Sequence, residues 1–228
     1  MTKLLALCAA MGMTAWVTAA APAPLKTQKE KVSYCIGLNI GKGMKAQQFD
    51  LDPDILVRGI KDALSGATPA LTDDQIRAVL TAFEQDARSR HESRLKAAAD
   101  KNQADGKAFL AANGAKADVK TTPSGLQYKI LKAGTGPRPK ATDTVVTHYR
   151  GTLLDGTEFD SSHKRGEPAE FPVNGVIRGW TEALQLMKVG AKWQLVVPSD
   201  LAYGPRGAGR RIGPNATLIF EVELLKIK

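Results

Sequence analysis

Apolar residues in the first half of the chain recur every three or four positions, a spacing that predicts amphipathic helices. A first helix is expected over residues 28–47, and the apolar positions that share one of its faces are Val32, Cys35, Ile36, Ile40 and Met44. A second helix is expected over residues 53–65, with Asp52 as N-cap, Pro53 at the first helical position and Gly66 at the C-terminal stop.

A third helix is expected to begin at Thr72, where Gln75 completes a capping box, and to end near Gly114. Over residues 86–107 this helix is almost entirely polar or alanine. A helix that is polar all round bridges two domains or stands in solvent, and about 40 residues would span about 60 Å. Gly106 is the expected weak point of this helix.

The first two helices are too short to bury their apolar stripes alone. We therefore expect the N-terminal half to dimerise, so that two chains share one core; the alternative is a monomeric helical cap on the second half. Cys35 lies on the apolar face, so a packing role is expected for it rather than redox chemistry.

Beyond a polar linker at residues 115–125, apolar and polar residues alternate with the period of β-strands. Asp155-Gly156 is a strong hairpin signal within this half. An antiparallel sheet holding one short helix is expected, which makes the fold α+β. The strands are expected over residues 126–132, 143–154, 157–160, 171–173, 191–197 and 217–226, and the helix over residues 178–187.

The first residues form a separate segment that resembles a secretory signal peptide. Lys3 precedes an apolar run over residues 4–17, and small residues follow at 18–21. This arrangement predicts cleavage near residues 20–23 and export of the mature chain. Only Cys8 precedes this point among the cysteines, so Cys35 is left without an intrachain disulfide partner.

Composition excludes several classes of function. The net charge of +9 comes from Lys and Arg that are mixed with acids along the chain, without a basic block, so a nucleic-acid-binding role is not expected. Neither the cysteine count nor the spacing of the three histidines predicts a metal site. The common nucleophile, phosphate-loop and dinucleotide motifs are also absent. An enzyme built from this chain would need no nucleophile, metal or cofactor.

A set of aromatic residues stands beside turn residues in the second half of the chain. Such a set can line an apolar pocket, although a sheet core also collects aromatics. Its members are Tyr149, Phe159, Phe171, Trp180, Tyr203 and Phe220.

The local strings around these aromatics are specific. In chain order they are His-Tyr-Arg-Gly at 148–151, Leu-Asp-Gly-Thr-Glu-Phe-Asp-Ser-Ser at 154–162, Val-Ile-Arg-Gly-Trp at 176–180, Met-Lys-Val-Gly at 187–190, Leu-Ala-Tyr-Gly at 201–204, and the segment 212–225. This set closely resembles the FK506-binding (FKBP) isomerase family over about residues 125–228. The helical half, with Lys-Val-Ser-Tyr-Cys-Ile-Gly at 31–37, resembles the macrophage infectivity potentiator subgroup, whose members are V-shaped dimers joined through an N-terminal helical domain.

The resemblance implies a pocket and a role for its residues. Trp180 would be the floor under the proline ring, Tyr203 would donate a hydrogen bond to a carbonyl, and Asp160, held by Arg165, would complete the catalytic group. The implied substrate-binding residues are Tyr149, Phe159, Phe171, Val176, Ile177, Ile212 and Phe220.

Two places depart from the family pattern. Ala169 stands where small eukaryotic members carry an aromatic residue. The loop 205–211 has Ala208 where some members have histidine, and it adds arginines at Arg206, Arg210 and Arg211. We expect these changes to affect ligand affinity and sequence preference more than activity.

The predicted domains are a signal peptide (1–23), a helical dimerisation domain (24–71), a long connecting helix (72–114), a linker (115–125) and an FKBP-like isomerase domain (126–228). The resemblance implies a homodimeric peptidyl-prolyl cis/trans isomerase, or rotamase, that assists folding of exported proteins in the periplasm, where attachment to the outer membrane is an alternative. Its expected partners are proline-containing polypeptides, with FK506- and rapamycin-type macrolides as inhibitors and no cofactor. The alternative function is a holdase chaperone or surface-binding protein that uses the cleft between two arms.

Overall fold

The computed structural model describes residues 24–228, which divide into one unit that ends at Thr72 and a second unit, Asp73–Lys228. The predicted signal peptide lies outside the described residues. Over residues 24–228, no helix combines the length and the apolar character needed to cross a membrane.

The first unit contains two helices, α1 (Gln28–Ala46) and α2 (Pro53–Ser65), which confirms the helices expected there. Thr27 caps α1 by accepting a hydrogen bond from the backbone NH of Glu30, and the Glu30 carboxylate accepts one from the NH of Thr27. The Asp52 side chain caps α2 as expected. Gly66 ends α2 in the left-handed conformation at φ 69°, which a residue without Cβ adopts readily.

The apolar stripes of these helices are mostly exposed within the described first unit. Neither helix has a fully buried residue, and Cys35 is exposed. Water-exposed apolar side chains include Val32, Ile36, Ile40, Ile55, Ile60 and Leu64. Contiguous apolar surface of this kind marks an interaction site more often than a solvated face.

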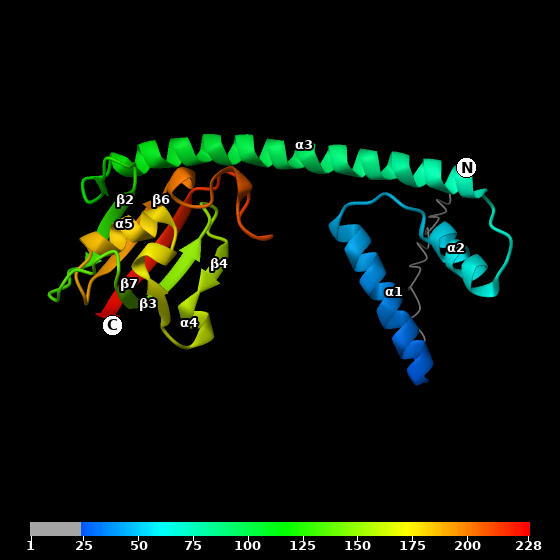
Figure 1. Ribbon diagram of the computed structural model, residues 1–228, viewed down its shortest axis with the longest axis horizontal. Helices are drawn as coiled ribbons and strands as arrows, with labels where there is room; N and C mark the ends of the chain where they lie inside the picture. Colours follow the sequence, from blue (N-terminus) through cyan, green and yellow to red (C-terminus); the bar gives the residue numbers. More distant parts are fainter. Residues whose placement is uncertain (1–23) are drawn as a thin grey trace, which may run out of the picture. The chain divides into compact units, whose positions relative to one another are not determined.

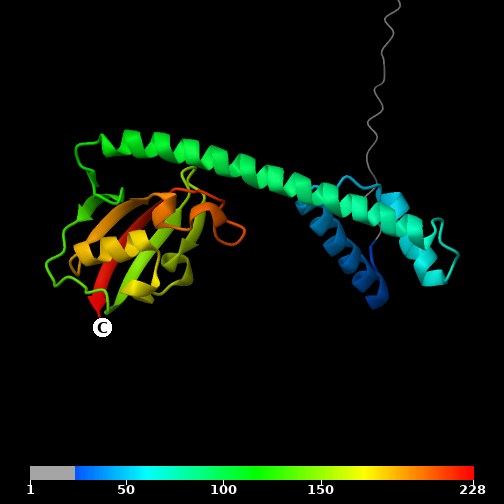
Figure 2. The same cartoon turned by 45° about the horizontal axis from the view of Figure 1, so that its top comes forward.

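The second unit is built on an antiparallel sheet with the order β1-β2-β6-β7-β3-β4, in which β5 also pairs with β3. Figures 1 and 2 show α5 (Arg178–Leu186) lying across one face of this sheet. The buried hydrophobic core lies between α5 and the sheet and includes Leu184, Leu195, Leu218 and Val222. The strands are β1 (Lys120–Thr121), β2 (Gln127–Lys132), β3 (Thr144–Thr152), β4 (Glu158–Ser161), β5 (Ala169–Pro172), β6 (Lys192–Val197) and β7 (Leu218–Ile227).

The hairpin between β3 and β4 forms where Asp155-Gly156 predicted it. The NH of Leu153 donates to the carbonyl of Thr157, and Gly156 has φ 85°. The Asp155 carboxylate accepts from the NH of Thr157 and closes the turn. This hairpin sets the register of β4, whose Asp160 pairs with Gly151.

Among the short elements that were not expected from the sequence are one strand, β1, and one helix, α4. β1 lies inside the stretch expected to be a linker, and it pairs with β2 through Lys120 and Thr121. α4 (Ser162–Arg165) is a single turn that Gly166 ends at φ 79°. Elements of two and four residues are too short to show a hydrophobic period, so only pairing and packing reveal them.

The long helix α3 (Asp73–Gly114) belongs to the second unit, and only Gly106 and Asn113 are buried on it. Its outer surface carries ion pairs such as Lys96–Asp100 at 2.8 Å, as expected for a solvated helix. Figures 1 and 2 show its last turns beside the sheet of this unit.

Gly106 is a packing site, so the expectation that it would be a weak point was wrong. A Cβ at this position would lie 2.4 Å from Oγ1 of the buried Thr217. Near it, Asn102 donates to the carbonyl of Pro214 at 2.8 Å, and Asn113 donates to Gln127 at 2.9 Å. Glycine is present because the helix approaches the start of β7 closely.

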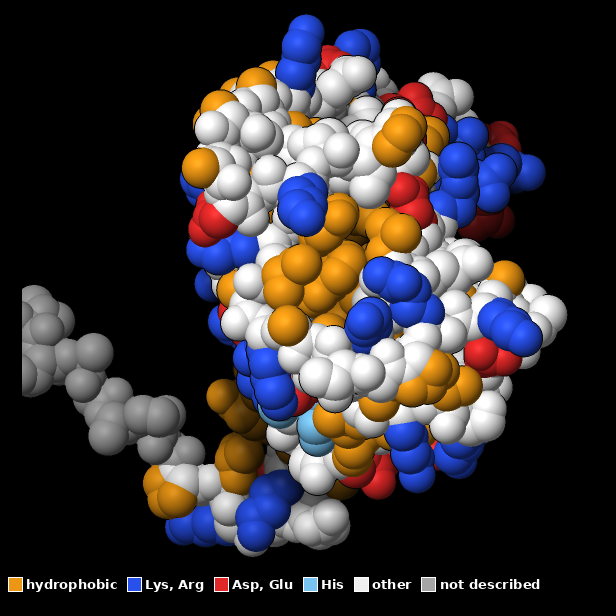
Figure 3. Space-filling view, turned by 90° about the vertical axis from the view of Figure 1, so that its left-hand side faces the viewer, with side chains coloured by type: hydrophobic (Ala, Val, Ile, Leu, Met, Phe, Trp, Pro, Cys, Tyr) orange, Lys and Arg blue, Asp and Glu red, His pale blue; other side chains and the backbone are white. Residues whose placement is uncertain are grey.

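On one face of the molecule (Figure 3) the positive charge is mixed with negative charge, as the sequence indicates. On the face seen in Figure 3, Lys and Arg side chains are scattered among Asp and Glu around a hydrophobic patch.

Candidate active site

A cavity of about 790 Å³ opens in the second unit between α5, β3, β4, β7 and the loop that follows Tyr203. Its lining is mainly apolar, with a few polar tips. The lining residues are Tyr149, Phe159, Asp160, Phe171, Gly175, Val176, Ile177, Trp180, Tyr203, Ala208, Gly209, Arg210, Arg211, Ile212 and Phe220.

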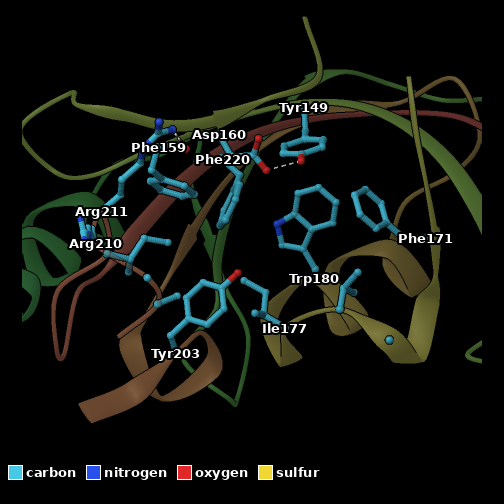
Figure 4. Close-up of a pocket in the computed structure, with 15 residues that line it drawn as sticks. Tyr149, Phe159, Asp160, Phe171, Ile177, Trp180, Tyr203, Arg210, Arg211 and Phe220 are labelled. Carbon is cyan, nitrogen blue, oxygen red and sulfur yellow. Dashed lines mark hydrogen bonds between the residues drawn. The ribbon is translucent and has the colours of Figure 1, made fainter. Parts of the chain in front are cut away.

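Trp180 forms the base of this cavity (Figure 4). The residue is 4% exposed, and its ring packs edge to face against three aromatic neighbours, with centroid distances of 5.2 Å to Tyr149, 5.7 Å to Phe171 and 5.3 Å to Phe220. Its Nε1 is buried and makes no hydrogen bond with a described residue. Apart from this NH, the base of the cavity is apolar, because the ring is surrounded by aromatic neighbours.

Glycines make the close packing around the cavity geometrically feasible. A Cβ on Gly179 would lie 2.5 Å from Cγ1 of Val197, so glycine lets the first turn of α5 sit close to β6 and sets the position of Trp180. A Cβ on Gly151 would lie 2.6 Å from the ring of Phe159 and 2.9 Å from that of Phe220. Those two rings fill this space instead and pack edge to face at 5.6 Å.

Asp160 is the acidic group of the cavity, and its carboxylate accepts hydrogen bonds from three residues. Nη1 of Arg165 donates to Oδ1 at 2.6 Å, the hydroxyl of Tyr149 donates to Oδ2, and the backbone NH of Ser161 donates to Oδ1 at 2.8 Å. Nη2 of Arg165 also donates to the Tyr149 hydroxyl at 2.8 Å. The expected contact between Arg165 and Asp160 is thus confirmed.

These contacts control the charge of the group. Burial raises the pKa of Asp160, but hydrogen bonds from Tyr149 and Arg165 outweigh burial, so the pKa lies below its ordinary value. Burial, with help from the carboxylate, raises the pKa of Tyr149. At neutral pH the pair is therefore a carboxylate and a protonated phenol.

Tyr203 stands at the rim, and Figure 4 shows its oxygen pointing into the cavity. The residue is 41% exposed, and its hydroxyl makes no hydrogen bond with a described residue. Burial, followed by the charge of Asp160, raises the pKa of Tyr203, so the phenol keeps its proton. It is free to donate to a carbonyl that enters the cavity.

The cavity gathers every residue that the sequence singled out for the site; their roles in binding and turnover stay predictions. Ala169, noted as a departure from the family, does not line the cavity and packs against the core. The lining residues that were not assigned to the site are Gly175, Ala208, Gly209, Arg210 and Arg211. The cluster of arginines in the loop after Tyr203 was the available signal for the last two.

Over residues 24–228, no group of three or more His, Cys, Asp or Glu side chains is placed to hold a metal ion. The cavity offers rings, one carboxylate in an ion pair and phenol donors, a set suited to binding an apolar segment with a carbonyl.

Comparison with known proteins covers both units. Residues 136–225 match the family described as FKBP-type peptidyl-prolyl cis-trans isomerase, and residues 29–130 match the domain amino terminal to it. The "Outer membrane protein MIP" of Legionella longbeachae is 48% identical over 218 residues, which is 96% of this chain and 94% of the relative. The "Peptidyl-prolyl cis-trans isomerase Mip" of Coxiella burnetii is 43% identical over 218 residues, 96% of this chain and 95% of the relative. The crystal structure of FkpA from Escherichia coli superposes with a TM-score of 0.70 at 42% identity, covering 90% of this chain and 99% of that one.

Proposed function

Because the chain belongs to the family of FKBP-type peptidyl-prolyl cis-trans isomerases, we propose that the cavity above Trp180 is where it rotates X-Pro bonds. One observation carries the proposal. An aromatic, mainly apolar cavity contains the charged carboxylate of Asp160, which accepts hydrogen bonds from Tyr149 and Arg165, and the phenol of Tyr203, which is free to donate one. The family and its relatives favour this isomerase over the holdase alternative.

The physical task of the cavity is to bind a twisted amide better than a planar one. Amide resonance sets a rotation barrier of about 18–20 kcal/mol, and uncatalysed X-Pro isomerisation takes about tens to hundreds of seconds. A twisted amide has lost resonance, so its carbonyl is less dipolar and an apolar surrounding disfavours it less than the planar form. Excluding water from the bond also removes solvent that stabilises the planar state.

Each residue has a proposed part in this task. The flat ring of Trp180 supports the proline ring, with Tyr149, Phe171 and Phe220 as walls. Tyr203 donates a hydrogen bond to a substrate carbonyl and fixes the chain on one side of the rotating bond. Asp160 keeps its charge, which favours the electron-poor carbonyl carbon of the twisted amide.

The first test is an isomerisation assay with a Leu-Pro tetrapeptide. Wild-type protein should accelerate the reaction, and Tyr203→Phe should lower kcat/KM by about 2- to 10-fold, the worth of about one hydrogen bond. Asp160→Asn, which keeps the shape and removes the charge, should lower it by about tenfold or more. A folded wild-type sample without turnover would overturn the proposal, and unchanged turnover in both variants would overturn the roles of these two residues.

We also propose that FK506- and rapamycin-type macrolides inhibit the enzyme by filling the same cavity. Its volume of about 790 Å³ falls within the usual range of ligand pockets, about 300–1,000 Å³. FK506 should block turnover of the tetrapeptide competitively, and purely non-competitive inhibition would place the macrolide elsewhere.

A homodimer through the first unit is the proposed assembly, because α1 and α2 have no fully buried residue within one chain. Ile36→Glu places a charge in the apolar stripe and should shift the protein to monomer in analytical ultracentrifugation. Lys31→Glu, an exposed position outside the stripe, is the matched control and should stay dimeric. A wild-type chain that sediments as a monomer would overturn the assembly.

For location we propose export to the periplasm, where the enzyme assists the folding of exported proteins. The leader pattern at residues 1–23 and a relative named as an outer membrane protein support this. Cell fractionation with mass spectrometry of the N-terminus tests it, since a periplasmic chain should begin near residue 21–24. Recovery of the full-length chain from the cytoplasm would contradict export.

A further inference from the structure

The loop that follows Tyr203 holds a rigid rim at the mouth of the cavity. Ala208 and Ile212 exchange two backbone hydrogen bonds, of 2.9 and 3.2 Å, so residues 209–211 form the tip of a small hairpin. Behind this tip, the NH of Asn215 donates to the carbonyl of Gly204 at 2.9 Å. The tip residues therefore keep a defined place beside the cavity.

The two arginines at this tip, which Figure 4 labels next to each other at one edge of the cavity, differ in what they contact. Nη1 of Arg211 donates to the backbone carbonyl of Phe159 at 2.9 Å and ties the tip to β4. Arg210 also lines the cavity, but it is exposed and makes no hydrogen bond or ion pair with any residue from 24 to 228. Its guanidinium is therefore available to a ligand.

Both acids of β4 already have cationic partners. Asp160, the one acid in the lining, is paired with Arg165 at 2.6 Å. Glu158, on the same strand, is paired with Arg150 at 2.7 Å and Lys164 at 2.8 Å. The lining thus has two arginines and one carboxylate, and that carboxylate is paired with Arg165 and not with Arg210.

We propose that Arg210 is a specificity residue that favours an acidic residue over its neutral amide, Glu over Gln, directly before or after the proline. The inference rests on the proposed isomerase site. A guanidinium forms two parallel hydrogen bonds with a carboxylate, a geometry that a neutral amide matches less well. The group is exposed, so the gain is modest and is screened by salt.

The experiment compares kcat/KM for peptides that differ only by Glu or Gln, first at the position before proline and then at the position after it. At low ionic strength, wild-type protein should prefer Glu over Gln by about two- to fivefold at one of the two positions, a range set by exposed ion pairs. The ratio should fall toward one at about 0.5 M salt, where the screening length is only about 4 Å. The ratio within each enzyme is the readout, so a general loss of activity cancels.

Two variants and a control attribute the preference. Arg210→Gln should bring the Glu/Gln ratio to about one, and Arg210→Glu should instead favour Lys over Gln at the same position. Lys226→Gln removes an equal charge from the exposed far end of β7 and should keep both the ratio and the turnover of the wild type.

The outcomes separate this inference from the proposed function. Wild-type turnover of a Leu-Pro peptide with a Glu/Gln ratio of one at both positions would overturn the role of Arg210 and leave the isomerase site intact. A wild-type preference that persists in Arg210→Gln would also overturn it. Absence of turnover on every peptide would instead overturn the proposed site.

Discussion

The guanidinium of Arg165 contacts the carboxylate of Asp160 at 2.6 Å, across the single turn of α4. Gly166 ends this turn in the left-handed region, so the chain folds back and brings position 165 next to position 160. The same guanidinium lies over the ring of Tyr149 at 5.4 Å. One cation thereby fixes both the charge of the carboxylate and the position of a wall of the cavity.

Removing this cation should change the pH dependence of turnover. Arg165 lowers the pKa of Asp160 in the folded protein, so Arg165→Gln should raise that pKa and move the acid limb of the kcat/KM profile to higher pH. Lys164→Gln removes a neighbouring charge that pairs with Glu158 instead, and its acid limb should match the wild type. Profiles recorded from about pH 4 to pH 8 would contradict this role of Arg165 if the two variants shifted equally.

Stability should follow the same group. Because the folded pKa of Asp160 is depressed, its contribution to the free energy of unfolding is present above the unfolded pKa of about 3.9 and is lost as pH falls through the folded pKa. Urea unfolding of the wild type and Arg165→Gln should differ more at about pH 6 than at about pH 3. An equal difference at both pH values would mean that Arg165 stabilises the fold by packing alone.

Two tryptophans separate catalysis from packing. Trp180→Phe should lower kcat/KM by about tenfold, equivalent to about 1.4 kcal/mol, because it shrinks the base of the cavity. Trp193 is similarly buried, stacks on Tyr128 at 4.3 Å and does not line the cavity. Trp180→Phe and Trp193→Phe should lower the free energy of unfolding by similar amounts, about 1–3 kcal/mol, but Trp193→Phe should leave turnover close to the wild type. Equal losses of turnover would contradict the special role of Trp180.

Two glycines of the rim loop should differ in their tolerance of alanine. Gly207 has φ 61° and ψ −163°, a region that is essentially restricted to glycine, and a Cβ there would lie 2.3 Å from the carbonyl oxygen of Ile212. Gly209 also has a positive φ, of 57°, but a Cβ there would meet open space. Gly209→Ala should cost about 1–2 kcal/mol of unfolding free energy, and Gly207→Ala should cost more. Urea titrations that reversed this order would contradict the described loop.

The contact between α3 and the sheet can be tested by a double-mutant cycle. Gly106→Ala improves helix propensity by about 1 kcal/mol, yet its Cβ would collide with Oγ1 of Thr217. We expect the collision to dominate and the variant to lose about 1–3 kcal/mol of stability. Thr217→Ala removes the colliding atom, so the double variant should be more stable than the sum of the two single effects. Additive effects would show that positions 106 and 217 are not energetically coupled, and would contradict the close contact between α3 and the start of β7.

Local chemistry determined most of the element boundaries. The Asp52 cap, Gly66 and the Asp155-Gly156 turn each act through atoms a few residues apart, so they are legible in the sequence. The alternation over residues 217–226 became β7, whose side chains alternate between buried and partly buried. The strings shared with the FKBP family named the residues that the cavity brings together.

Only the tertiary structure decided the contacts made between distant segments. Gly106 was interpreted as a weak point because helix propensity is local, whereas its reason is Thr217, which lies 111 residues further along the chain. The guanidinium of Arg210 is likewise unpaired for a tertiary reason. Lys164 and Arg165 pair with the two acids of β4, and Arg211 donates to a backbone carbonyl of the same strand. Periodicity and turn chemistry record what neighbouring residues prefer, but a close approach or an unpaired charge is a property of surfaces that meet only after folding.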